Sequence, residues 1–221
     1  MRRILFYFST TFLVLIISCH TTEKKETVAR LSVENPTQPE LSKYKTAYFA
    51  SGCFWCVEAI FQSVKGVKEV ISGYSGGNEP NPTYEQVGSG QTTHAEAVEV
   101  YYDPKIVRYE TLVKVFFGSH DPTTLNRQGP DRGSQYRSIA FYKNKEEKKI
   151  IETYIKKLEA EKVYDNEIVT QVVPFKVFYK AEDYHQEYEK LHPNNPYVQR
   201  VSIPRLKAFQ KKYPELLKET H

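Results

Sequence analysis

The pattern of apolar and polar residues beyond residue 43 changes period repeatedly, and it predicts strands and helices in turn. Strand-like runs lie at 46–50, 68–74, 95–102 and 137–142, and another at 167–173 is expected to continue past Pro174 to Phe178. Helical spacing marks 57–64, 109–118 and 145–162. This order predicts an α+β domain: a two-layer mixed sheet with packed helices and a ferredoxin-like, split βαβ core.

Two long polar segments interrupt this pattern, at 75–93 and 119–136. Loops of this length inside a compact domain usually have a function. The tail from about Ala181 is expected to form a short helix, and then an irregular stretch at 194–204 that wraps over the domain.

The first forty residues differ from the rest. Arg2 and Arg3 precede an apolar stretch at 4–17 that is too short to span a bilayer, so it predicts an export signal. The stretch ends at Ser18-Cys19, which resembles a bacterial lipobox, although Cys19 could instead be lost with a cleaved peptide. The predicted organisation is a lipoprotein signal peptide at 1–18, a lipidated N-terminus and disordered tether at 19–42, and a folded domain at 43–221. We therefore expect a protein of the bacterial cell envelope, lipid-anchored on the periplasmic or outer-surface side.

Charge argues against a nucleic-acid partner. Loss of the signal peptide lowers the number of basic residues from 31 to 29 against 27 acids, so the formal charge falls from +4 to +2. No basic run interleaved with aromatic residues is present. We expect a monomer that binds no nucleic acid.

Cys53 and Cys56 are the main chemical feature, because they lie where a strand gives way to a helix. At a helix N-terminus, free N–H groups and the helix dipole favour an anion, so we expect the Cys53 thiol, ordinarily with a pKa of about 8.5, to be partly ionised at neutral pH. Cys56 follows one turn later on the same face and can reach Cys53 to close a disulfide.

Two less reactive interpretations of this pair remain possible. A zinc site needs four ligands, and the mature chain offers no second cysteine pair, so we expect no metal. A purely structural disulfide would close so short a loop that it would remove little unfolded-state entropy.

Glu96 is the second chemical feature. Strand alternation places it on the same face as Val98 and Val100, so its carboxyl group is expected to face the core. Burial would raise its pKa and keep it protonated near neutral pH, as a general acid requires. The alternative is that the Val98 face is exposed, or that Glu96 lies at a solvated strand end.

Tyr84 and Tyr136, in the two long loops beside this strand, could donate hydrogen bonds to an S=O or C=O oxygen. With seventeen tyrosines in the chain, either could equally be a core or rim residue.

Six short segments together resemble one enzyme family, and they occur in order between residues 43 and 204. They are Gly52-Cys53-Phe54-Trp55, Gly73-Tyr74-Ser75-Gly76-Gly77, Asn81-Pro82-Thr83-Tyr84, His94-Ala95-Glu96-Ala97-Val98, His120-Asp121-Pro122-Thr123-Thr124 and Asp131-Arg132-Gly133-Ser134-Gln135-Tyr136-Arg137-Ser138. The sequence resembles the A class of peptide methionine sulfoxide reductases.

This resemblance implies a role for each candidate residue. Cys53 would attack the sulfoxide sulfur, Glu96 would protonate the oxygen, and Tyr84 and Tyr136 would assist by hydrogen bonding. The resemblance further implies that Phe54 and Trp55 receive the S-methyl group and that Asp131 holds the substrate. The expected substrate is the S epimer of methionine sulfoxide, free or in proteins, reduced without a cofactor through a Cys53 sulfenic acid.

The chain departs from the commonest pattern of that family in two ways. Cys56 stands where many members have glycine, and the tail contains no cysteine. We therefore predict that Cys56 resolves the sulfenic acid as a disulfide, which a thioredoxin-like partner then reduces. The cysteine pair leaves two alternative functions. One is that of a thioredoxin-type oxidoreductase, which would not need Glu96, and the other is that of a ligand-binding lipoprotein, which would not need Cys53.

Overall fold

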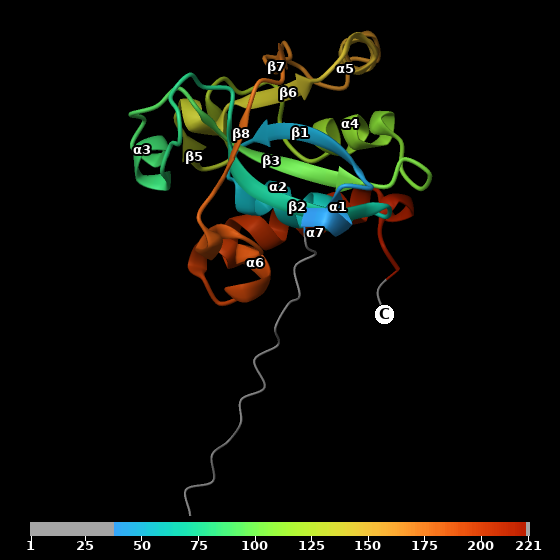
Figure 1. The fold of residues 1–221 in the computed structure, drawn as a ribbon. Coiled ribbons are helices and arrows are strands. Elements are labelled where there is room, and N and C mark those ends of the chain that lie inside the picture. The colour runs from blue at the N-terminus through green and yellow to red at the C-terminus, as the bar shows by residue number, and fades with distance from the viewer. Residues whose placement is uncertain (1–37, 220–221) are drawn as a thin grey trace, which may run out of the picture. The chain divides into compact units, whose positions relative to one another are not determined.

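The computed structural model describes residues 38–219, and most of its strands form one six-stranded sheet in the order β7-β6-β1-β3-β2-β8. These strands are β1 (Lys45–Ser51), β2 (Val67–Ser75), β3 (Ala95–Tyr102), β6 (Ser138–Tyr142), β7 (Gln171–Pro174) and β8 (Phe178–Lys180). Neighbours are antiparallel except β6 and β7, which are parallel, so the sheet is mixed as predicted. Figure 1 shows β1 and β3 at its centre.

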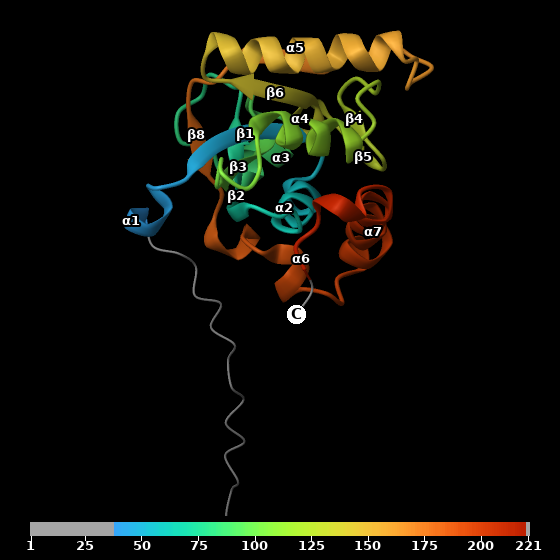
Figure 2. The same ribbon diagram turned by 90° about the vertical axis from the view of Figure 1, so that its right-hand side faces the viewer.

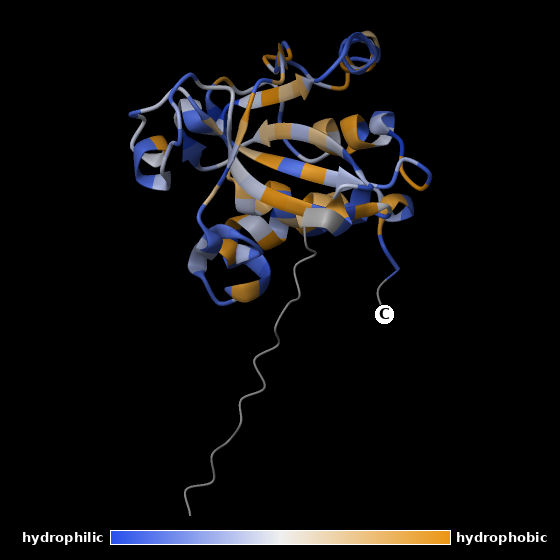
Figure 3. Cartoon of the chain, viewed as in Figure 1, coloured by the Kyte–Doolittle hydropathy of each residue, from blue (hydrophilic) through white to orange (hydrophobic). Residues whose placement is uncertain are grey.

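Helices cover one face of this sheet. The helices are α1 (Gln38–Leu41), α2 (Phe54–Gln62), α3 (Tyr84–Gly88), α4 (Tyr109–Gly118), α5 (Lys145–Ala160), α6 (Tyr188–Leu191) and α7 (Ile203–Lys212). Figure 2 shows α5 along β6, with α6 and α7 beside α2. Hydrophobic residues gather along the central strands, α2 and α4, whereas α5 is mainly hydrophilic (Figure 3).

The larger core lies between the sheet and these helices. Phe49 of β1 stacks against Phe61 of α2 and Phe116 of α4, with ring centroids 5.2 and 5.0 Å apart. The opposite face is covered by the chain that joins β7 to β8, where Phe175 stacks on Tyr48 at 3.7 Å. The central strands are therefore buried on both faces.

The strand expected at 167–178 is in fact two strands on opposite edges of the sheet. β7 pairs with β6, whereas β8 pairs with β2. β7 ends at Pro174, and the Phe175 N–H makes one further hydrogen bond, to the Tyr142 carbonyl oxygen of β6. The chain then crosses the sheet to form β8.

Several segments expected to be irregular contain regular structure. The loop at 75–93 includes α3, which begins with a capping box between Thr83 and Gln86. The loop at 119–136 includes the short hairpin of β4 (Arg127–Gln128) and β5 (Asp131–Arg132). The stretch at 194–204 contains a π-helical turn, Val198–Ser202, that leads into α7. Pro204 lies in the first turn of α7, where a helix tolerates proline.

The folded domain also begins earlier than expected. Residues 38–42 were assigned to the tether, but Gln38–Leu41 is helical and Leu41 is only 3% exposed. The predicted signal peptide, Cys19 and the rest of the tether lie outside the described residues. Between residues 38 and 219 no helix has both the length and the apolar character needed to cross a membrane.

Candidate active site

The turn between β1 and α2 places Cys53 at the start of a helix, as the sequence predicted. Gly52 has a φ of +85°, and a Cβ there would lie 2.6 Å from the Cβ of Gln128. Only glycine therefore fits this turn without displacing the neighbouring loop. Cys53 is the N-cap residue of α2, and its own side chain makes no capping hydrogen bond.

Glu96 lies in the core beneath the start of α2, so the prediction of a buried carboxyl group is confirmed. Its side chain is on the helix-covered face of β3 and is 1% exposed, and its Oε2 accepts a hydrogen bond of 3.0 Å from the Phe54 N–H. Burial raises the pKa of Glu96 to about 8, with smaller contributions from Asp131 and Cys56. The carboxyl group is therefore mainly protonated at neutral pH.

Cys53 and Cys56 are both free thiols, both are buried, and they contact each other. Burial raises the pKa of Cys53 well above its ordinary value, whereas the hydrogen bond from Cys53 lowers the pKa of Cys56 to about 6. Burial and the neighbouring Glu96 therefore oppose the ionisation of Cys53 that the helix N-terminus favours. The two thiols titrate as a coupled pair, in which burial opposes a charge on Cys53 and the hydrogen bond favours one on Cys56.

The two loop tyrosines meet at this site, as predicted. The ring of Tyr84 stacks against Phe54 with centroids 6.2 Å apart, and burial, aided by Glu96 and Cys53, raises the pKa of Tyr84 to about 12. Burial and the same two groups also raise the pKa of Tyr136. Both hydroxyls remain neutral hydrogen-bond donors near neutral pH.

Phe54 and Trp55 belong to an aromatic cluster that the tail completes. Phe54 is fully buried, with its ring 5.1 Å from that of His185. Trp55 stacks on Tyr188 at 3.7 Å and donates a hydrogen bond of 3.2 Å from Nε1 to Nδ1 of His185. A segment more than a hundred residues away in sequence therefore holds Phe54 and Trp55 in place.

Asp131 lies over the start of α2. Its carboxylate accepts hydrogen bonds from the Cys53 N–H and, at 2.6 Å, from the Tyr197 hydroxyl. Burial raises its pKa, and this effect outweighs the two hydrogen bonds.

Four tail residues of the site were not predicted from the sequence: His185, Tyr197, Ser202 and Arg205. Only the prediction that the tail wraps over the domain pointed to their location, because no spacing relates them to Cys53.

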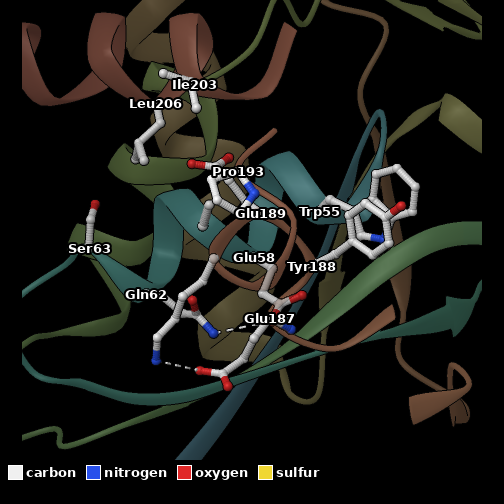
Figure 4. Close-up of a pocket in the computed structure, with 12 residues that line it drawn as sticks. Trp55, Glu58, Gln62, Ser63, Glu187, Tyr188, Glu189, Pro193, Ile203 and Leu206 are labelled. Carbon is white, nitrogen blue, oxygen red and sulfur yellow. Dashed lines mark hydrogen bonds and ion pairs between the residues drawn. The ribbon is translucent and has the colours of Figure 1, made fainter. Parts of the chain in front are cut away.

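A cavity of about 430 Å³ adjoins the site but does not include the thiols. Figure 4 shows Trp55 and Tyr188 at one side of it and the buried Glu58 beside Gln62. Across residues 38–219, no three His, Cys, Asp or Glu side chains cluster in a way that could hold a metal ion.

Comparison with known proteins gives a consistent result. A family model described as peptide methionine sulfoxide reductase matches residues 45–217. A peptide methionine sulfoxide reductase MsrA of Sulfolobus acidocaldarius is 50% identical over 171 residues, which cover 77% of this chain and 96% of that protein. One of Nitratiruptor sp., with the same name, is 50% identical over 173 residues, covering 78% and 98%.

Solved structures agree with the sequence matches. Methionine sulfoxide reductase A of Corynebacterium diphtheriae superposes with a TM-score of 0.61 at 37% identity, covering 67% of this chain and 75% of that one. The reduced form of Mxr1 from Saccharomyces cerevisiae gives 0.62 at 34% identity, covering 68% and 87%. The chain is therefore an oxidoreductase that belongs to the peptide methionine sulfoxide reductase family.

Proposed function

We propose that this enzyme reduces the S epimer of methionine sulfoxide, free or in proteins, by transferring the sulfoxide oxygen to Cys53. The observation that carries the proposal is that a buried, protonated carboxyl group, Glu96, and a buried thiol, Cys53, both lie at the start of α2. A nucleophile and a neutral acid in one water-poor site are what deoxygenation of a sulfoxide requires.

In the first step, Cys53 loses its proton and reacts as a thiolate. The Cys53 thiolate attacks the sulfoxide sulfur while Glu96 donates its proton to the oxygen. The hydroxyl group then moves with its electron pair to Cys53, which becomes a sulfenic acid. The S–S bond formed by the attack breaks at the same time, and its electron pair stays on the sulfur of the departing methionine.

The surrounding side chains position the substrate. Tyr84 and Tyr136 donate hydrogen bonds to the sulfoxide oxygen, where negative charge develops before protonation. Phe54 and Trp55 receive the S-methyl group, supported by their place in the aromatic cluster. Asp131 holds the substrate near the Cys53 N–H.

In the second step, Cys56 attacks the Cys53 sulfenic acid. An S–S bond forms, and the hydroxyl group leaves with a proton as water. The hydrogen bond between the two buried thiols supports this step, because it places Cys56 beside the sulfur that it attacks. A thioredoxin-like dithiol then reduces the disulfide and is itself oxidised.

Replacing Cys56 with serine is expected to preserve one turnover per molecule and to abolish turnover driven by a thioredoxin-like protein. Methionine release in a single turnover and steady-state turnover with thioredoxin measure the two effects, and mass spectrometry after a dimedone trap follows the sulfenic acid. Steady turnover with thioredoxin in the serine variant would contradict a resolving role for Cys56.

The topology supports the finer fold assignment that we propose, a split βαβ core. Strands β1, β2, β3 and β6 form the order β6-β1-β3-β2, with α2 following β1 and α4 following β3. This arrangement brings the start of α2 directly over β3, and hence Cys53 over Glu96.

We also propose that Cys19 carries a lipid and that the enzyme repairs oxidised proteins of a bacterial envelope. The support is the sequence Leu15-Ile16-Ile17-Ser18-Cys19 after an export signal. Replacing Cys19 with alanine is expected to move the protein from the detergent phase to the aqueous phase in a detergent-partition assay. Equal partitioning of the wild type and this variant would contradict the anchor.

A further inference from the structure

The polar surroundings of Cys56 come mainly from one short stretch of the tail. Apart from Cys53, its polar neighbours are the hydroxyls of Tyr197 and Ser202 and the guanidinium of Arg205. The Tyr197 hydroxyl lies 3.8 Å from Cys56 Sγ. The π-helical turn Val198–Ser202 runs directly into α7, which packs against α2 (Figure 2), so backbone geometry fixes these groups against the thiol.

Arg205 is held firmly in this position. Its Nε donates a hydrogen bond of 2.8 Å to the Ser119 carbonyl oxygen, and its Nη2 donates one of 3.3 Å to the Ser51 hydroxyl. Its Nη1 lies 3.5 Å from the point that a Cβ on Gly52 would occupy. The guanidinium therefore lies beside the turn that leads into Cys53 and the first turn of α2.

Of the tail groups near Cys56, only Arg205 has a charge free to favour an anion. Tyr197 and Ser202 each have one hydroxyl proton, and they donate these protons to Asp131 and Glu189. In the described part of the chain, no carboxylate forms an ion pair with Arg205.

The remaining ionisable groups at the pair are Cys53, Glu96, Asp131 and Tyr197, and all of these are neutral or negative. None of them supplies a positive charge, and those that are deprotonated oppose a negative charge on the sulfur of Cys56. The positive charge of Arg205 lowers the pKa of Cys56. Among the groups that lower this pKa, only the hydrogen bond from Cys53 has a larger effect.

We propose that Arg205 is a positioning residue for the second step, which holds Cys56 as a thiolate for attack on the Cys53 sulfenic acid. The inference rests on the proposed function, because it concerns the thiol assigned there as the resolving group. Once Cys53 is oxidised it no longer offers a thiol proton to Cys56, so Arg205 becomes the main group that favours the anion. The thiolate attacks sulfur, the S–S bond forms, and the hydroxyl leaves with a proton as water.

The test compares Arg205→Met, which removes the charge, with Arg205→Lys, which keeps it. Each reduced protein is mixed with excess methionine-S-sulfoxide and quenched with acid across a range of pH. Disulfide formation between Cys53 and Cys56 is counted by mass spectrometry, and methionine release in the same samples reports the first step separately.

Because removal of an adjacent opposite charge shifts a pKa by about one unit or more, the pH midpoint of disulfide formation should rise by at least that amount in Arg205→Met. Below the midpoint, disulfide formation in Arg205→Met should be about tenfold slower than in the wild type. Arg205→Lys should keep most of the wild-type rate of disulfide formation.

An unchanged midpoint in a folded Arg205→Met protein would overturn the inference, as would a slowing that is equal at every pH. If Arg205→Met does not fold, the ultraviolet thiolate absorbance of the reduced wild type, minus that of Cys56→Ser, decides. The inference requires Cys56 to titrate below the value of about 8.5 for a free cysteine, and a midpoint at or above it would overturn the inference. Absence of any Cys53–Cys56 disulfide in the wild type would instead refute the proposed second step itself.

Discussion

Replacing Glu96 with glutamine is expected to slow methionine sulfoxide reduction by about a hundredfold to ten-thousandfold, the usual contribution of a positioned general acid. Glutamine keeps the shape of the side chain and can still accept the hydrogen bond from the Phe54 N–H, but it has no acidic proton to give to the oxygen. The fold should be retained, which a thermal unfolding curve checks.

The pH profile provides a second measure of the same residue. Only the acid form of Glu96 can donate a proton, and its pKa is about 8, so the rate of methionine release should fall as the pH rises through that value. Glu96→Gln should lack this dependence. Glu99→Gln is the matched control, because Glu99 lies on the other face of β3, hydrogen-bonded to Tyr48 and Tyr101. If Glu96→Gln and Glu99→Gln were equally active, Glu96 would not be the acid.

Replacing Cys53 with serine is expected to reduce the activity about ten-thousandfold or more, because nothing else in the site can take the oxygen at a comparable rate. The thiol of Cys56 has a low pKa, but it is 1% exposed and surrounded by Cys53 and the tail. Single-turnover methionine release from each sulfoxide epimer measures the loss, with Cys56→Ser as the control that keeps the first turnover. Comparable release by Cys53→Ser and the wild type would contradict the mechanism.

Local sequence patterns were enough to locate the reacting groups. The strand-to-helix junction placed Cys53 at the start of α2, and strand alternation placed Glu96 beneath it, because both features depend on residues only a few positions apart. The short motifs around Cys53 and Glu96 then indicated the family, which the comparisons confirm.

The properties that depend on distant residues could not be predicted in this way. The helix N-terminus alone suggested that Cys53 is ionised, but burial beside Glu96 and Cys56 raises the pKa of this thiol, and the local pattern could not indicate that burial. Tyr197 and Arg205 reach the site because the tail returns to α2, and no local pattern indicates that return. The single strand expected across Pro174 is in fact β7 and β8, on opposite edges of the sheet. Each error concerns a contact between segments that are far apart in sequence.

The most direct test of the account is to follow the oxygen atom itself. Cys56→Ser protein is mixed with one equivalent of methionine-S-sulfoxide that carries a heavy oxygen isotope, and the peptide containing Cys53 is analysed by mass spectrometry with rapid quenching. The account predicts one heavy oxygen on Cys53 for each methionine released. Release of methionine with the heavy isotope in water or on another residue, and none on Cys53 at the earliest times, would contradict it.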